Sequence, residues 1–200
     1  MSEQTSTPKL TDRFSEALEF AERKHRSQVR KGGDIPYVGH LLTVAGLVIN
    51  DGGSEDQAIA ALLHDAVEDA GGPPTLEEIR AKFGEDVARI VDECSDTDEV
   101  PKPPWRNRKT RYIKHLGEVS PDTLLVSVAD KLDNARSMLR DYHEHGSKLW
   151  ERFTVKNADD HLWYYGELLA AYRGRGLDKQ SWMVDELGRV VDELKTLVES

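Results

Sequence analysis

The amino-acid sequence predicts an all-α protein, built as a compact multi-helix bundle. Apolar residues recur at the 3.6-residue spacing of helices nearly throughout the 200 residues, and capping residues precede several of these runs. A short segment near Tyr37 is the single candidate strand. The polar N-terminus predicts a disordered tail over residues 1–10. Because no interior linker separates two cores, we expect one domain over residues 11–200.

Each helix expected in the first half of the chain has a recognisable start or stop signal. Thr11 or Asp12, Ser54 and Thr75 are side chains that can cap a helix, and glycine and proline runs provide the stops. A basic, glycine-containing loop follows the first helix over residues 28–37. The expected helices cover residues 12–25, 40–49, 54–70, 75–83 and 85–94.

The second half begins with a loop over residues 95–104 that carries acidic residues and three prolines. A strongly basic helix should follow it. Ser120 and Pro121 mark another helix start, because proline is favoured at the first helical position. The expected helices cover residues 105–118, 121–140, 157–173 and 180–198.

Composition narrows the classes of protein. A net charge of −10 argues against non-specific nucleic-acid binding, which depends on lysine and arginine neutralising phosphates. No apolar run approaches the roughly 20 residues that span a bilayer, and the polar N-terminus lacks the core of a signal peptide. Cys94 is the only cysteine, so no intrachain disulfide can form. We therefore expect a cytoplasmic protein without a membrane or nucleic-acid partner; a homo-oligomer stays open.

The run from Ala60 to Ala70 is the most informative stretch, because an apolar helix ends there in four ionisable residues. Buried charges are tolerated when they are paired or bind a metal. In a continuous helix, His64 and Asp65 form one ledge. Glu68 and Asp69 form a second ledge one turn along, about 5–6 Å away. The run therefore indicates a hydrolytic metal site.

Two other segments offer the further ligands that a metal needs. His40 begins an apolar helix; without a metal, it is simply a neighbour of a helix N-cap. Asp130 lies among apolar residues, where a lone carboxylate is costly, although pairing with Lys131 or Arg136 is the alternative. Two imidazoles and two carboxylates suit Mn²⁺, Fe²⁺ or Zn²⁺, and a carboxylate-rich site favours Mn²⁺.

Glu68 and Asp69 are placed to orient a water molecule or to move protons. A bound divalent metal lowers the pKa of water and polarises a phosphoryl oxygen. Crowded carboxylates tend to have separated pKa values, so one can accept a proton while the other donates. Without such chemistry, the two residues are the exposed end of a helix.

Several polar residues could bind a phosphorylated substrate. Arg30 and Lys31 precede two glycines and could meet a phosphate or stack on a base, or form a solvated basic turn. Asn134 shares a helix face with Asp130 and could bond to a ribose or a phosphate. Arg136 could reach the same cleft or pair with an acidic neighbour.

A basic segment and an aromatic segment add weaker candidates. Arg108, Lys109 or Arg111 could lie over the cleft and attract phosphates, or form a solvated helix face. An aromatic stripe combines packing and cleft candidates in His161, Trp163, Tyr164 and Tyr165.

With these residues in place, the chain resembles the HD-domain phosphohydrolases. More closely, residues 12–175 resemble the hydrolase domain of the RelA/SpoT family, in particular the stand-alone small alarmone hydrolases. The matching segments are His25–Gly33, Pro36-Tyr37, Ala61–Asp69, Phe83-Gly84 and Ala129–Arg136.

The resemblance implies a site and a reaction. One Mn²⁺ per chain would be held by His40, His64, Asp65 and Asp130. Glu68 and Asp69 would assist the attacking water, Arg30 would lie near the base, and Lys31 and Asn134 would line a nucleotide pocket. The implied reaction removes the 3′-pyrophosphate from guanosine 3′,5′-bis(diphosphate) or the pentaphosphate, or from an adenosine analogue.

Other functions stay open at this point. One is an HD-domain nucleotide phosphatase, such as an NADPH 2′-phosphatase, and another is a nucleotide-sensing or antitoxin-like binding protein. The chain also departs from the family: Leu41 stands where proline usually follows the first ligand histidine, and the segment from Cys94 to Pro104 replaces a threonine-lysine loop. That acidic segment leaves the identity of the base open.

Overall fold

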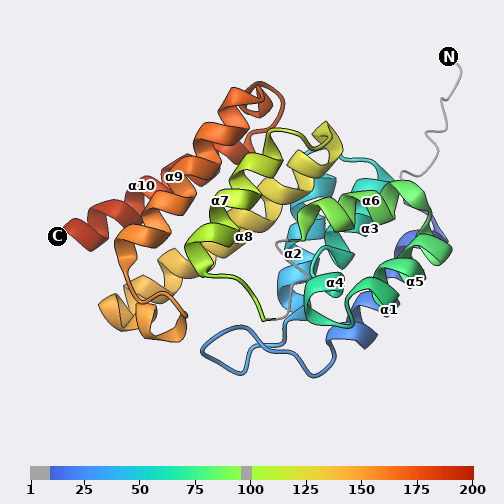
Figure 1. Ribbon diagram of the computed structural model, residues 1–200, viewed down its shortest axis with the longest axis horizontal. Coiled ribbons are helices and arrows are strands. Elements are labelled where there is room, and N and C mark those ends of the chain that lie inside the picture. Colours follow the sequence, from blue (N-terminus) through green and yellow to red (C-terminus); the bar gives the residue numbers. More distant parts are fainter. Residues whose placement is uncertain (1–9, 96–100) are drawn as a thin grey trace, which may run out of the picture.

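The computed structural model describes residues 10–95 and 101–200, and throughout these ranges the chain is all-α, which confirms the fold class (Figure 1). The tail over residues 1–9 and part of the acidic segment, residues 96–100, lie outside the described residues. The helices are α1 (Asp12–His25), α2 (Val38–Asn50), α3 (Glu55–Leu63), α4 (Ala66–Asp69), α5 (Pro73–Phe83), α6 (Glu85–Cys94), α7 (Trp105–Leu116), α8 (Pro121–His145), α9 (Ala158–Gly174) and α10 (Met183–Glu199), with 3₁₀ turns η1 (Gly146–Arg152) and η2 (Leu177–Lys179).

The long helix α8 connects the two sides of the molecule. In Figure 1, α1 to α6 lie on one side of α8, and α9 and α10 lie on the other. Helix α8 packs against α2, α3 and α6 as well as against α10 and η1. One cluster of buried apolar residues includes members from both sides. A side chain on the middle of α8 can therefore meet residues from the first half of the chain.

The expected helix over residues 54–70 is wrong in one respect, because it breaks at His64 and Asp65. Its start is as expected: Ser54 and Gln57 form a reciprocal capping box. Asp65 then has φ −99° and ψ −2°, which ends α3 and allows the short α4 to begin at Ala66. The two ledges of a continuous helix are thus replaced by a turn, which lets two adjacent side chains point into one site.

Two further helix limits differ from the expectation. The Pro73-Pro74 pair begins α5 instead of ending the preceding helix, because proline fits the first helical turn. Thr75 therefore lies inside α5, and its hydroxyl donates to the Ala70 carbonyl instead of capping. Helix α8 continues to His145, beyond the expected residue 140. The candidate strand near Tyr37 is a single bridge between Val29 and Pro36 within the basic loop.

Three buried hydroxyl groups form a hydrogen-bonded chain between α8 and its neighbours. The hydroxyl of Ser127 lies 2.7 Å from the hydroxyl of Tyr112 on α7 and 2.7 Å from that of Tyr172 on α9. All three side chains are buried, so each hydroxyl depends on the others for its hydrogen bonds. This chain ties α7, α8 and α9 together.

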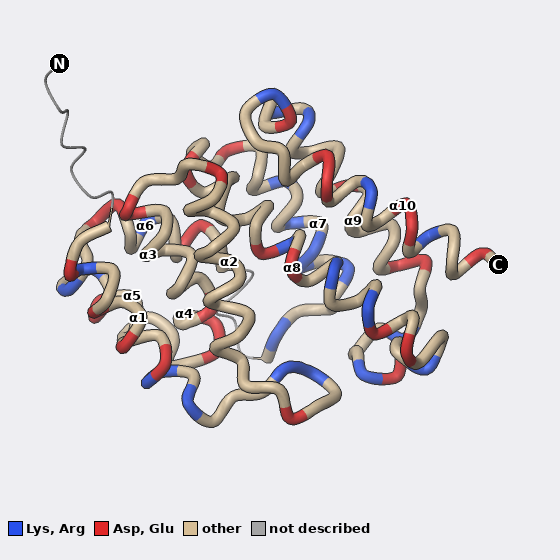
Figure 2. The backbone as a smooth tube through the Cα atoms, turned by 180° about the vertical axis from the view of Figure 1, so that it is seen from behind, with Lys and Arg blue, Asp and Glu red and all other residues tan. Residues whose placement is uncertain are grey.

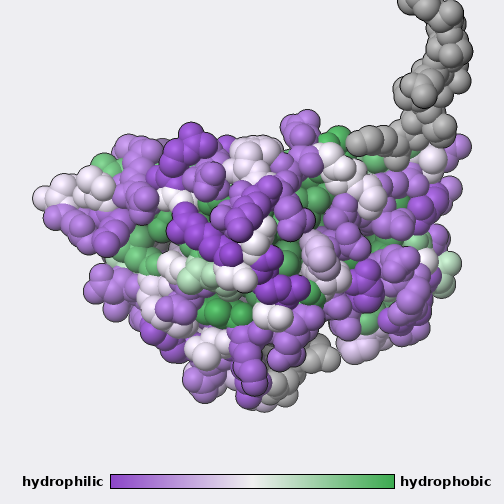
Figure 3. Space-filling model, turned by 90° about the horizontal axis from the view of Figure 1, so that it is seen from above, coloured by the Kyte–Doolittle hydropathy of each residue, from purple (hydrophilic) through white to green (hydrophobic). Residues whose placement is uncertain are grey.

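Among the described residues, the exposed large hydrophobic side chains are those of Val29, Ile35, Leu42, Ile49 and Trp182. The face in Figure 3 is mostly hydrophilic, with small and scattered hydrophobic spots. Among the described residues, no helix combines the length and the apolar character that a membrane crossing requires.

Candidate metal centre

Four side chains from separate parts of the chain meet at one point. His40 comes from the first turn of α2, His64 and Asp65 from the break between α3 and α4, and Asp130 from the middle of α8. Ligand atoms of His40, His64 and Asp65 all lie within 4.8 Å of one another. Asp130 Oδ1 lies 3.2 Å from His40 Nε2 and 3.6 Å from His64 Nε2.

Both histidines are oriented as metal ligands are. His40 Nδ1 donates to a carboxylate oxygen of Asp133 at 2.6 Å, and His64 Nδ1 donates to the Ala61 carbonyl at 2.8 Å. Each Nε2 is buried and makes no hydrogen bond of its own, although carboxylate oxygens approach it. Such an arrangement fixes the tautomer and aims the Nε2 lone pair at a metal. The residues present therefore fit a divalent ion.

The electrostatics of the cluster follow from burial and from the short distances. Burial alone would lower the pKa of both histidines, but nearby carboxylates outweigh it. Asp65 and Asp130 raise the pKa of His64, and Asp130 and Asp133 raise that of His40. Burial alone would raise the pKa of Asp130, but the Lys131 ammonium and the two imidazoles hold it well below its usual range. The cluster thus gathers negative charge around both imidazole Nε2 atoms, as a site for a cation requires.

Further residues complete this cluster: the sequence indicated Lys131 and Asn134 as neighbours of Asp130, but it indicated no role for Tyr37. Tyr37 donates its hydroxyl to Asp65 Oδ2. Lys131 Nζ lies 2.5 Å from Asp130 Oδ2, and the Asn134 amide donates to Asp130 Oδ1 at 2.5 Å. The i, i+4 spacing that marks Asn134 could have drawn attention to Asp133 beside it, but Tyr37 carries no local signal.

His40, His64, Asp65 and Asp130 are called the metal-type cluster below. Glu68 and Asp69 lie beside it, and both line a cavity that also reaches Asp65 and Asp130. Glu68 pairs with Lys102 at 2.7 Å, and Asp69 Oδ2 accepts a hydrogen bond from the Gln28 amide at 2.7 Å. Partial desolvation, and then the charge of Asp65, raise the pKa of Asp69 above its usual value. A raised pKa makes the Asp69 carboxylate a stronger base than an ordinary aspartate.

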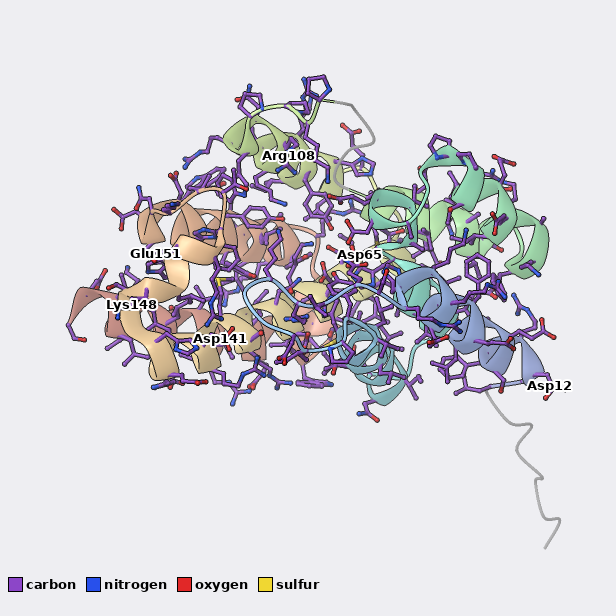
Figure 4. All side chains as sticks on the ribbon, turned by 90° about the horizontal axis from the view of Figure 1, so that it is seen from below. Asp12, Asp65, Arg108, Asp141, Lys148 and Glu151 are labelled. Atoms are coloured by element: carbon purple, nitrogen blue, oxygen red, sulfur yellow. The ribbon has the colours of Figure 1, made fainter. Side chains whose placement is uncertain are left out.

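The cavity has a volume of about 750 Å³ and extends from the metal-type cluster to a group of lysine and arginine side chains. In Figure 4, Asp65 lies near the middle of the molecule, and Arg108 lies on α7 toward the rim. Figure 2 shows basic segments on the loop between α1 and α2 and on α7. The lysines and arginines that line the cavity are Arg30, Lys31, Lys102, Arg108, Lys109, Lys131, Arg140 and Arg152.

The basic loop lies tightly against η1 at one side of the cavity. Gly32 has φ +85°, and a Cβ atom there would come within 2.2 Å of Arg152 Cδ. Only glycine suits both the backbone conformation and this close approach. The loop thereby brings Arg30 and Lys31 to the cavity wall.

The structure brings most of the predicted substrate residues together and leaves one outside. Arg30, Lys31 and Asn134 line the cavity, as do Arg108 and Lys109. Arg136 is not among the lining residues; it points toward α10 and pairs with Glu186 at 2.8 Å. For Arg136, the acidic-neighbour alternative therefore describes its position, and the cleft alternative does not.

An all-helical fold with a buried His/Asp cluster is typical of metal-dependent hydrolases. The HD domain family matches residues 17–157, and the chain belongs to that family. The guanosine-3′,5′-bis(diphosphate) 3′-pyrophosphohydrolase MESH1 of Xenopus tropicalis is 43% identical over 128 residues, which cover 62% of this chain and 69% of the relative. The resemblance to RelA/SpoT-family hydrolases is thus confirmed.

Solved structures agree with this family. A metazoan ortholog of SpoT that hydrolyzes ppGpp superposes with a TM-score of 0.59 and 30% identity, covering 86% of this chain and 99% of the ortholog. A protein from Listeria monocytogenes EGD-e superposes with a TM-score of 0.67 and 30% identity, covering 80% of this chain and 99% of that protein.

Proposed function

We propose that this protein is a Mn²⁺-dependent alarmone hydrolase, which removes the 3′-pyrophosphate from guanosine 3′,5′-bis(diphosphate) or the pentaphosphate. The observation that carries the proposal is the convergence of His40, His64, Asp65 and Asp130 beside a cavity lined by cations. The names of the similar MESH1 proteins and of the SpoT ortholog supply the reaction.

The chain's own residues divide the work of the reaction. His40, His64, Asp65 and Asp130 would hold the metal, which, when bound, lowers the pKa of water and polarises a phosphoryl oxygen. Asp69, with its raised pKa, accepts a proton from the attacking water. Gln28 fixes one of its oxygens, so the carboxylate is held in a defined orientation.

Glu68 would help Asp69 to orient the attacking water, and Lys102 would bind a substrate phosphate. The 2.7 Å ion pair of Glu68 and Lys102 lies at the cavity wall, where substrate phosphates would compete with Glu68 for the ammonium. Arg30, Lys31, Arg108 and Lys109 surround the space with positive charge, which a pyrophosphate and a second diphosphate require. A local cationic wall can exceed the effect of the net charge of −10.

A product assay tests this function. Metal-loaded protein is incubated separately with the guanosine alarmone, the adenosine analogue and NADPH. We expect pyrophosphate from the guanosine alarmone, no pyrophosphate after Asp65→Asn substitution, and parental rates for Asp122→Asn, a matched change at the start of α8. Release of orthophosphate from NADPH alone would replace the proposal with the phosphatase alternative. A folded, metallated protein that releases neither product is a binding protein.

We also propose that residues 11–200 act as one domain. The protein would work in the cytoplasm, as a monomer or a homo-oligomer, without a nucleic-acid partner. We expect the segment from Cys94 to Pro104 to contribute to the choice between guanosine and adenosine; of its described residues, Cys94 and Lys102 line the cavity. Its residues 96–100 lie outside the described residues.

A further inference from the structure

Asp133 joins the metal-type cluster to the basic loop through one oxygen atom. Its Oδ2 accepts from His40 Nδ1 at 2.6 Å and from Arg30 Nη1 at 3.1 Å. Asp133 lies on α8, His40 on α2 and Arg30 in the loop that precedes α2. The side chains of Asp133 and Arg30 are 18% and 17% exposed, and that of His40 is fully buried, so solvent competes weakly for these bonds.

A second set of contacts runs from the same loop to the same cluster. Arg30 Nη2 donates to Asn134 Oδ1 at 3.4 Å, which is a long contact, and the Asn134 amide donates to Asp130 Oδ1 at 2.5 Å. Because Asp130 lies 3.2 Å from His40 Nε2, the five side chains form a closed ring. Each route from Arg30 to a candidate ligand takes two contacts, but only the route through Asp133 joins Arg30 to an ionised group.

The chemistry of these bonds gives Asp133 two effects. A carboxylate that accepts from the second nitrogen of a ligand histidine fixes its ring and increases its basicity, and loss of such a partner typically weakens metal binding about 10–100-fold. The same oxygen holds the Arg30 guanidinium beside the cavity in a charge-assisted hydrogen bond. A change at His40 can therefore reach Arg30 through the single Oδ2 atom of Asp133, which is the more direct of the two routes.

We propose that Asp133 is a positioning residue that couples divalent-metal binding at His40 to the position of the basic loop at Arg30. The inference rests on the proposed metal centre. In the metal-bound protein, His40 is fixed by the ion on one nitrogen and by Asp133 on the other. Asp133 then has one orientation, and Arg30 is held at the substrate end of the cavity.

Calorimetric titration with Mn²⁺ tests the first arm. We expect Asp133→Asn to weaken Mn²⁺ binding about 10–100-fold relative to the parent. Asp122→Asn is the matched control: it removes a carboxylate of the same helix that accepts from Gln57 at 3.0 Å, away from the cavity, and it should leave the affinity unchanged. Asp133→Ala gives the same expected loss if the asparagine variant does not fold.

Hydrogen exchange at the Arg30 amide tests the second arm, because this N–H donates to the Ile35 carbonyl at 2.9 Å within the basic loop. In the parent, saturating Mn²⁺ should slow exchange of this amide about fivefold or more. In Asp133→Asn, at Mn²⁺ concentrations that saturate the variant, the slowing should disappear.

The outcomes separate this inference from the proposed function. A parent that binds no Mn²⁺ contradicts the metal centre itself. A parent that binds Mn²⁺, with an Asp133→Asn affinity within about twofold of it, overturns the role of Asp133 and leaves the metal centre intact. Persistent slowing at Arg30 in the saturated variant also overturns the coupling, because it assigns the link to Asn134 or to the contact between Tyr37 and Asp65.

Discussion

Binding of Mn²⁺ should release protons from His40 and His64 and should therefore depend strongly on pH. In the metal-free protein, the neighbouring carboxylates raise the pKa of both imidazoles above the ordinary value, against the effect of burial. A metal requires the neutral ring, because it takes the lone pair that the proton occupies. At about pH 6.5, each ring is then more than half protonated, and each Mn²⁺ should release about one to two protons.

The distances in the cluster give this prediction its magnitude. His64 Nε2 lies 3.0 Å from Asp65 Oδ2, and His40 Nε2 lies 3.2 Å from Asp130 Oδ1, so a proton on each ring has a carboxylate partner. With two protons displaced, the apparent dissociation constant should fall up to about a hundredfold for each unit of pH, until the pH passes the raised pKa values.

The same shifts fix the sign of the effect on stability. The folded-state pKa of each imidazole lies above its unfolded value, so the metal-free protein has this stabilisation at low pH and loses it as the pH rises through the folded pKa. Bound Mn²⁺ stabilises by mass action and binds better as the pH rises. The difference in melting temperature between metal-loaded and chelator-treated protein should therefore widen with pH.

Calorimetry in two buffers of different ionisation enthalpy measures the proton count, and thermal unfolding measures the stability difference. His64→Ala should lower the count. His143→Gln is the control, because His143 pairs with Glu193 at 3.3 Å on the surface. A release below about half a proton per Mn²⁺ near pH 6.5, or a melting difference that does not change with pH, would refute the reasoning.

Other predictions concern single residues. Glu68→Gln should bind the alarmone at least as tightly as the parent, because the Lys102 ammonium loses its ion-pair partner, and should lose about 100-fold or more in turnover; unchanged turnover would contradict its role. Chelation should lower the melting temperature of the parent, and an Asp65→Ala protein that stays equally chelator-sensitive would argue against ligation. Ser127→Ala leaves two buried tyrosine hydroxyls without their shared partner and should cost about 1–3 kcal/mol in urea unfolding. Arg136→Ala should leave KM unchanged, because Arg136 pairs with Glu186 outside the cavity; a several-fold higher KM would place it in the site.

The sequence by itself determined what depends on neighbours along the chain. The helical periodicity and the caps at Ser54 and Ser120 predicted most helices, because capping and amphipathic spacing are local properties. The residue types of His64 and Asp65 indicated a metal site for a similar reason: ionisable groups at the end of an apolar run need a partner. Local rules failed where one residue type is compatible with two structures. Proline can follow the end of a helix or begin the next one, and Pro73 begins α5.

Only the tertiary structure decided which side chains meet. Asp133 contacts Arg30 across 103 positions of the sequence, whereas Arg136, three residues further along α8, faces α10 and contacts Glu186. The break at His64 and Asp65 likewise turns two adjacent side chains into one site. Such contacts depend on how the helices pack against one another. The packing energy comes from residues far apart in the sequence, so a local sequence pattern does not predict these contacts.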